Sequence, residues 1–343
     1  MRLQRFLDEQ VDRGVWSAVV GLMGTAEAVE WEGVAGEARP GSAASVSTRF
    51  DYASLTKPYT ATLALLLDAD GTLPLGTPIG DVWPEAHPKL GGRPLSDLLR
   101  HRSGLAGWTP LYERCNSREQ VLAILLDGGL LGARAGTYSD LGFILWALAA
   151  EERTGQPLGE MLRSRVLAPL GLDGVEASPG ERPDLAESRM GTGKEMALAA
   201  RQGLAIEDQG APPVGLPQDG NARFLVSRFG WGGGVCGHAG LFGGARALWR
   251  LGAEWLAPGR LLHPVSVSAA LTGEGSFALG WWRRTLRNSA GRALSPASFG
   301  HTGFAGGSLW IDPEEGRVLV LLGSRLDPAS DMNRWRRRFH ALA

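Results

Sequence analysis

The chain has 343 residues, of which 44% are hydrophobic, and a formal net charge of −1. This length and composition are typical of a soluble globular protein with a large core. The balanced charge gives no basic field for nucleic acid, and no apolar run reaches the roughly 18 residues of a membrane helix. Arginines in the segment 331–342 alternate with an apolar stripe, so we interpret them as the solvated face of a helix.

The N-terminal segment and the cysteines predict a cytoplasmic protein. Apolar residues recur there with helical spacing, at Leu3, Phe6, Leu7 and Val11. This amphipathic pattern differs from the basic-then-apolar layout of a secretory signal. Cys115 and Cys236 are too few for a disulfide framework and form no C-x-x-C pair, so we expect both to be reduced.

Apolar spacing and turn residues predict strands at both ends of the chain and helices between them. The predicted strands are 18–23, 29–35, 308–311 and 318–322. The predicted helices are 54–69, 117–126, 141–153, 158–167 and 331–342, and the helix at 117–126 begins with a Ser117–Gln120 capping box. The segment 171–237 is rich in Gly and Pro with little periodicity, and we expect it to border a pocket.

This order predicts an α+β fold with an antiparallel β-sheet built from both termini, flanked by helices and carrying a mainly helical insertion. We expect a single domain over 1–343. Its sheet subdomain spans roughly 1–53 and 240–343, and its mainly helical subdomain spans roughly 54–239. The active site is expected where the two subdomains meet.

Ser54 and Lys57 form the most informative pair in the chain. Only three lysines occur, at 57, 89 and 194, so arginine carries nearly all positive charge. Arginine keeps its proton, whereas a buried lysine can become a neutral base. Helical spacing of three residues places the hydroxyl and the amine on one face, where the amine can activate a serine nucleophile. The structural alternative is a serine cap followed by a solvated lysine.

Tyr138 and Asp140 lie just before the predicted helix 141–153. A phenol at such a boundary can point into a cleft, and a neighbouring ammonium that lowers its pKa would let it take the serine proton. The alternative is a half-buried tyrosine beside an ordinary aspartate cap.

His301, Thr302 and Gly303 are predicted to begin a strand that continues through Ser308 and Leu309. Glycines at 306 and 307 allow close backbone approach. An amide of this edge, paired with the Ser54 amide, would hold an oxyanion while His301 and Thr302 contact the acyl group. The alternative is a histidine at a strand end satisfied by the backbone.

Taken together, S-x-x-K at Ser54, Y-x-D at Tyr138 and H-T-G at His301 resemble the three motifs of the serine β-lactamase and penicillin-binding protein superfamily. Order and separation both fit, and the resemblance covers nearly the whole chain. Four further sequence segments resemble the class C and esterase-like branch of this superfamily, namely 51–53, 98–105, 237–242 and 300–304.

The resemblance implies a role for each of these residues. Ser54 would be the acylated nucleophile, Lys57 its proton partner and Tyr138 the general base. His301 and Thr302 would lie on the substrate-binding strand with Gly303, and the amides of Ser54 and Phe304 would form the oxyanion hole. No cofactor and no metal are implied.

Two residues depart from the family pattern. Asp140 stands where the motif usually has asparagine, and His301 where it usually has lysine. A carboxylate at 140 is expected to keep Lys57 charged, which favours Tyr138 as the base. A mostly neutral His301 weakens recognition of a substrate carboxylate. We therefore expect an esterase or amidase with poor β-lactam turnover.

Other patterns are weaker. The glycines of 232–237 match G-x-G-x-x-G but continue as loop, and Lys194 lacks the rest of a phosphate loop. The histidines show no metal-binding spacing, no G-x-S-x-G occurs, and we interpret His101 beside Ser103 as a structural turn. The tryptophans at 231, 281 and 282 fit either an aromatic pocket or the core.

The sequence thus predicts a cytoplasmic serine hydrolase that acts on a small-molecule ester, amide or β-lactam substrate through an acyl-enzyme on Ser54. Nucleic-acid and membrane partners are not expected. Two alternatives stay open: a penicillin-binding or sensor-like module without turnover, and a D-amino-acid peptidase or carboxypeptidase.

Overall fold

The computed structural model describes residues 2–134, 136–327 and 330–343. Its first elements are α1 (Arg2–Asp12), β1 (Trp16–Gly24), β2 (Val29–Arg39), β3 (Ser42–Ala43), β4 (Phe50–Asp51) and a 3-10 turn (Ala53–Leu55). Its last elements are β6 (Leu241–Gly243), α13 (Ala245–Leu256), α14 (Pro264–Leu271), β7 (Trp282–Arg283), β8 (Phe299–Thr302), β9 (Ser308–Asp312), β10 (Arg317–Arg325) and α15 (Met332–Leu342).

The segment between these groups is mainly helical. Its first helices are α2 (Thr56–Ala69), α3 (Ile79–Val82), α4 (Pro88–Gly91), α5 (Leu95–Leu99), α6 (Leu111–Arg114), α7 (Arg118–Leu126) and α8 (Asp140–Thr154). These are followed by α9 (Leu158–Leu162), a π-helical turn (Arg163–Leu167), α10 (Ala168–Leu170), β5 (Glu176–Ala177), α11 (Gly193–Ala200), α12 (Gly220–Phe229) and a 3-10 turn (Trp231–Gly233). No helix in the described ranges has both the length and the apolar character needed to cross a membrane.

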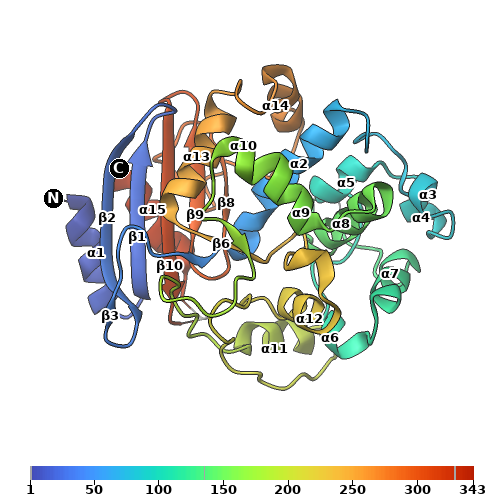
Figure 1. Ribbon diagram of the computed structural model, residues 1–343, viewed down its shortest axis with the longest axis horizontal. Coiled ribbons are helices and arrows are strands. Elements are labelled where there is room, and N and C mark those ends of the chain that lie inside the picture. The colour runs from blue at the N-terminus through green and yellow to red at the C-terminus, as the bar shows by residue number, and fades with distance from the viewer. Residues whose placement is uncertain (1, 135, 328–329) are drawn as a thin grey trace.

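The main sheet has seven strands in the order β3-β2-β1-β10-β9-β8-β7, and its neighbours are antiparallel. Its centre joins the two ends of the chain, because β1 pairs with β10 and places Val20 opposite Leu322. Figure 1 shows these blue and red strands side by side. The predicted α+β fold with an antiparallel sheet from both termini is confirmed.

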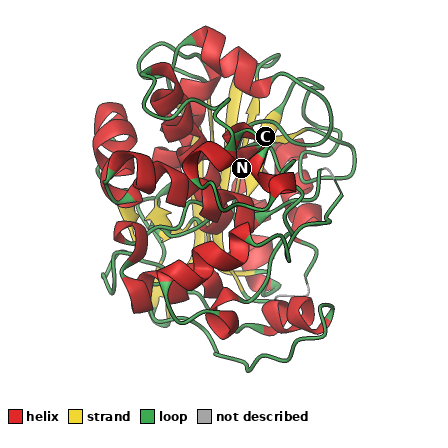
Figure 2. Cartoon of the chain, turned by 90° about the vertical axis from the view of Figure 1, so that its right-hand side faces the viewer, coloured by secondary structure: helices red, strands yellow, loops and turns green. Residues whose placement is uncertain are grey.

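Both faces of the sheet are buried, because apolar side chains along a strand point alternately to one face and to the other. Ala18, Val20 and Leu22 point into the large core that the helical segment shares, whereas Val19 points the other way into a smaller core. The smaller core is closed by α1 and α15, whose apolar stripes supply residues such as Phe6 and Phe339. Figure 1 shows the sheet at the left and the helical segment at the right, and Figure 2, seen from that right-hand side, shows helices in front of the strands.

One predicted strand is wrong. His301 and Thr302 end β8, and the chain then reverses, so that Thr302 pairs with Ser308 of β9. The reversal is a glycine turn in which the Gly303 amide donates to the Gly307 carbonyl at 2.8 Å. Gly306 has a φ of +125°, a conformation that favours glycine, so the predicted continuous strand is in fact two strands.

The segment 171–237 contains two helices that the sequence did not predict, α11 and α12. Asp219 caps α12 by accepting a hydrogen bond from the Ala222 amide at 2.8 Å. Flanking glycines and prolines hide these short helices from periodicity. β5 lies in the segment expected to be helical, and α13 and α14 lie in the segment expected to form the sheet.

Candidate active site

Ser54 lies in the 3-10 turn that connects β4 to α2. The preceding residue, Ala53, has a φ of +46°, which is strained for a residue with a Cβ. Its amide donates to Asp51 Oδ1 at 2.7 Å, and Asp51 Oδ2 accepts from the Gln218 amide at 2.7 Å. Burial raises the pKa of Asp51 to about 6. Contacts from both sides therefore hold the turn that presents Ser54.

Ser54 Oγ is contacted by two of the predicted partners. Lys57 Nζ donates to it at 2.9 Å, and the Tyr138 hydroxyl donates to it at 2.9 Å. The serine side chain caps neither the 3-10 turn nor α2, and Lys57 is 0% exposed. The alternative of a capping serine with a solvated lysine is therefore excluded.

Lys57 has an acceptor for each of its three ammonium hydrogens. Besides Ser54 Oγ, it donates to Asp140 Oδ1 at 2.7 Å and to the His238 carbonyl at 3.2 Å. Burial lowers the pKa of Lys57, and the Asp140 carboxylate opposes this shift without cancelling it. The expected influence of Asp140 is present, but desolvation outweighs it.

Tyr138 packs between aromatic rings. Its ring stacks on Trp282 with centroids 5.5 Å apart and lies 4.6 Å from the His101 ring. Burial and then the Asp140 charge raise the pKa of Tyr138 well above its ordinary value, although its hydrogen bond to Ser54 lowers it. The expectation that an ammonium lowers this pKa is wrong, because desolvation of the phenolate dominates.

Asp140 is the first residue of α8, and the cap of this helix is its neighbour Ser139. The Ser139 hydroxyl accepts from the Gly142 amide at 3.2 Å. Because Ser139 performs the capping, the Asp140 carboxylate is available for Lys57. The alternative of Asp140 as the cap is therefore excluded.

His301 on β8 is 1% exposed and does not line the cavity at Ser54. Its Nδ1 lies 2.9 Å from the Thr302 carbonyl, and its Nε2 has no partner among the described residues. Burial and then the charge of Lys57 lower the pKa of His301 to about 3, so the ring is neutral. Thr302 is half-buried at the end of β8. This arrangement does not support the expected contact of His301 with an acyl group.

Gly303 and Phe304 follow β8 and approach the nucleophile turn. A Cβ at Gly303 would lie 2.7 Å from the Tyr52 carbonyl oxygen, so only glycine fits there. Within the described residues, no backbone carbonyl outside the 3-10 turn accepts from the Ser54 amide, and none accepts from the Phe304 amide. Phe304 lines the same cavity as Ser54. Two unpartnered amides are what an oxyanion hole requires.

The cavity at Ser54 has a volume of about 770 Å³. It is lined on one side by apolar residues from the 106–133 region and from α11, namely Ala106, Trp108, Leu130, Leu131, Ala133 and Leu198. It also receives charged side chains, namely Asp140, Lys194, Glu195, Arg201 and Asp219. Trp108 is the tryptophan of this wall, whereas Trp231 and Trp281 are buried in the core.

The sequence did not predict an ion pair between Asp219, which lines the cavity, and the buried His238. His238 Nε2 lies 2.9 Å from Asp219 Oδ1, and the carbonyl of the same histidine accepts from Lys57. Burial opposes both shifts, but each partner acts on the other, which raises the pKa of His238 and lowers that of Asp219. The pair thereby fixes one acceptor of the lysine. The one sequence feature noted near this pair was the segment 237–242, which contains His238 and resembles the family.

The structure also places the weaker sequence signals. His101 Nδ1 accepts from the Ser139 amide at 2.9 Å, which supports the structural interpretation of this histidine. The glycines of 232–237 form a 3-10 turn and loop and open no helix. In the described ranges, no group of three or more His, Cys, Asp and Glu side chains is arranged to hold a metal ion.

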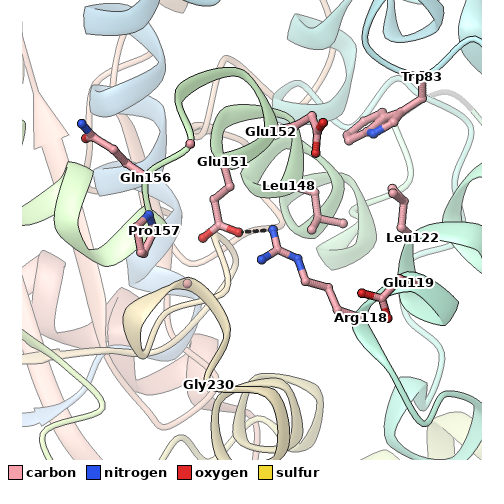
Figure 3. A pocket seen from close by; sticks show the side chains of 12 residues that line it. Trp83, Arg118, Glu119, Leu122, Leu148, Glu151, Glu152, Gln156, Pro157 and Gly230 are labelled. Carbon is pink, nitrogen blue, oxygen red and sulfur yellow. Dashed lines mark hydrogen bonds and ion pairs between the residues drawn. The ribbon is translucent and has the colours of Figure 1, made fainter.

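A second cavity of about 520 Å³ lies at the far end of α8 (Figure 3). Arg118 extends across it to Glu151, whose Oε2 it contacts at 2.5 Å. Glu151 also accepts from Trp231 Nε1 at 3.1 Å and from the Leu158 amide at 2.8 Å. The described residues that line this cavity include no serine, cysteine or lysine.

Comparisons with known proteins find relatives that are named as hydrolases. The chain is 28% identical to the N-acetylmuramyl-L-alanine amidase of Bacillus subtilis over 83% of its length and 71% of that protein. It is 28% identical to esterase EstB of Burkholderia gladioli over 80% of its length and 77% of that protein. The solved structure of EstCE1, a hydrolase with promiscuous acyltransferase activity, superposes with a TM-score of 0.77 at 18% identity, covering 100% of this chain and 98% of the other.

The Beta-lactamase family model matches residues 3–343, which is nearly the whole chain. Members of this family are serine hydrolases, and the relatives named above include an esterase and an amidase. The chain therefore belongs to the Beta-lactamase family, within the superfamily of serine β-lactamases and penicillin-binding proteins.

Proposed function

We propose that this protein hydrolyses an ester or amide through an acyl-enzyme on Ser54, and that the chain works as one serine-hydrolase domain. The observation that carries the proposal is the position of Ser54 Oγ. It lies 2.9 Å from both Lys57 Nζ and the Tyr138 hydroxyl, on the wall of a cavity. A nucleophile with a proton acceptor and a proton donor in reach is the arrangement that acyl transfer needs.

We assign the general base to Lys57, which acts after its ammonium has lost a proton. Its pKa is lowered from the ordinary value, whereas that of Tyr138 is raised, so the lysine loses its proton at the lower pH of the two. The neutral amine takes the proton of Ser54 while Oγ forms a bond to the substrate carbonyl carbon. This assignment replaces the general-base role that the sequence implied for Tyr138.

The tetrahedral intermediate places its negative oxygen between the amides of Ser54 and Phe304. When the carbonyl re-forms, the bond to the leaving group breaks and Tyr138 donates its proton to the departing oxygen or nitrogen. The ammonium of Lys57 then returns a proton to the tyrosinate. Water attacks the acyl-enzyme by the same route, which releases the acid and restores Ser54.

The apolar wall at Trp108, Leu131 and Leu198 suits an ester or amide with an apolar portion. His301 is neutral and outside the cavity, so it supplies no charge for a substrate carboxylate. We therefore propose that short-chain esters turn over faster than β-lactams. Turnover of a chromogenic cephalosporin without hydrolysis of nitrophenyl esters would contradict this preference.

Labelling with a fluorophosphonate probe tests the nucleophile directly. Intact-mass spectrometry is expected to show one adduct on the unmodified protein and none on Ser54→Ala. Ser103→Ala, which changes a buried serine outside the cavity, is the matched control and should label like the parent. An equal adduct on the Ser54→Ala variant would remove the proposed nucleophile.

The name of the Bacillus subtilis relative favours a second candidate, an amidase, and the D-amino-acid peptidase or carboxypeptidase predicted from the sequence belongs to the same class of amide hydrolases. Hydrolysis of D-alanyl peptides or amides in preference to esters would support it. A third candidate, a sensor without turnover, predicts a stoichiometric burst that is not followed by steady release. The cytoplasmic location stays a prediction from the sequence.

A further inference from the structure

Helix α11 presents a cationic stripe to the cavity at Ser54. Lys194 and Leu198 of α11 and Arg201, which caps its C-terminal end, are spaced by four and three residues, so they share one face, and all three line the cavity. Lys194 and Arg201 are exposed and form no ion pair with a carboxylate among the described residues. Two cations without acidic partners thus border the substrate space.

Lys194 lies close to the proposed oxyanion hole. Its Nζ is 4.7 Å from the centroid of the Phe304 ring, and Arg325 lies 5.9 Å from the same centroid. Arg336 donates to the Gly303 carbonyl at 2.8 Å. Cations therefore gather around Gly303 and Phe304.

The carboxylates of the cavity do not neutralise this stripe. Asp140 is paired with Lys57, and Asp219 is paired with His238. Glu195 accepts from the Tyr112 hydroxyl and the Gly220 amide, both at 2.8 Å. Each of these acidic side chains therefore already has partners of its own, whereas Lys194 and Arg201 have no acidic partner in the part of the chain that the structure describes.

We propose that Lys194 and Arg201 bind a carboxylate of the substrate, so that the enzyme prefers esters or amides that carry an anionic group directed toward α11. The proposal rests on the proposed acyl transfer at Ser54 and names the class of substrate. The positive charge that recognises the substrate then comes from Lys194 of α11 and from Arg201 at its end. It does not come from β8, where His301 is neutral and buried. The apolar wall beside it would hold the carbon chain that carries the carboxylate.

Two matched pairs of esters test the preference and identify where the carboxylate lies. The first compares the mono-nitrophenyl ester of adipic acid with nitrophenyl hexanoate, which places the charge in the acyl part. The second compares an acetate ester of a carboxylated nitrophenol with nitrophenyl acetate, which places it in the leaving group. In at least one pair, kcat/KM is expected to be about fivefold higher for the anionic ester, as for two exposed ion pairs.

The double variant Lys194→Met/Arg201→Met is expected to reduce this ratio to about one, mainly through KM, while Lys194→Arg retains it. Lys89→Met, an exposed lysine outside the cavity, is the matched control and should keep the parent ratio. High salt should lower the parent ratio, because exposed charges are screened. A parent ratio of one in both pairs, or an unchanged ratio in the double variant, would overturn the proposal.

These outcomes are separate from failure of the proposed function. Hydrolysis of nitrophenyl hexanoate that disappears in Ser54→Ala supports acyl transfer whatever the anionic ratio is. Hydrolysis that survives in Ser54→Ala contradicts acyl transfer at this serine.

Discussion

Helix α8 carries an ion-paired acidic residue near each end, and the two ends differ in what they can do. At its start, Asp140 contacts Lys57, which is 0% exposed. Near its other end, Glu151 contacts Arg118, whose side chain is 43% exposed. The same kind of ion pair therefore occurs once with lysine and once with arginine.

The difference lies in the proton and in the remaining partners. Lys57 shares its ammonium with the Ser54 hydroxyl, and burial lowers the pKa of the lysine. Arg118 keeps its proton, and Glu151 is satisfied by fixed donors. An ion pair can take part in proton transfer where its cation can lose a proton beside a nucleophile. Where the cation cannot lose a proton, the pair has a structural role.

The strongest test of this contrast removes each cation in turn. Lys57→Met is expected to lower kcat/KM for nitrophenyl esters by about a thousandfold or more, because Ser54 loses its base. Arg118→Met is the control at the other end of α8, and its kcat/KM should stay within about twofold. Comparable losses in both variants would show that α8 acts as one unit rather than as two separate ends.

Tyr138→Phe tests the proton donor. It is expected to lower kcat by about a hundredfold, because the leaving group must then depart without a proton. The loss should shrink for esters of acidic phenols, which need little protonation, and grow for esters of simple alcohols. An equal loss for both classes of leaving group would contradict the donor role.

Glu151→Ala tests the structural pair through stability. It leaves Trp231 Nε1 and the Leu158 amide without their buried acceptor, each worth about 1–3 kcal/mol. We expect a loss of about 2–4 kcal/mol in the free energy of unfolding, measured by denaturant titration, with little change in kcat/KM. Glu152→Ala alters an adjacent residue of the same cavity and should change stability by less than about 0.5 kcal/mol.

The sequence predicted the end of α8 with the proposed catalytic residues better than the end at Glu151. Short-range spacing and the order of the motifs identify the residues at this end, namely Ser54, Lys57, Tyr138 and Asp140. Glu151 lies in an ordinary helical pattern, and its partners come from α7 and from the turn after α12. Such contacts are set by tertiary packing, which produces no periodic pattern in the sequence.

Two site features could not be predicted for the same reason. The raised pKa of Tyr138 depends first on burial, which is a property of the folded core. The pairing of Asp219 with His238 joins residues 19 apart, across α12 and the glycine-rich loop that follows it.

The turn at Gly303 to Gly307 was missed for another reason, because glycines interrupt a strand pattern without marking a reversal.

Of these substitutions, Asp140→Asn changes the Lys57–Asp140 pair of the proposed site least, because it keeps the shape of the side chain and removes only its charge. Asp140 opposes the lowering of the Lys57 pKa, so its loss should lower that pKa further. The neutral base is then present at lower pH, and the acid limb of the kcat/KM profile should move down by about one to three pH units. Because Asp140 also raises the pKa of Tyr138, a shift alone does not identify the base. Tyr138→Phe resolves this, since a limb set by Lys57 persists without the phenol, and a limb that vanishes in Tyr138→Phe would return the base to the tyrosine.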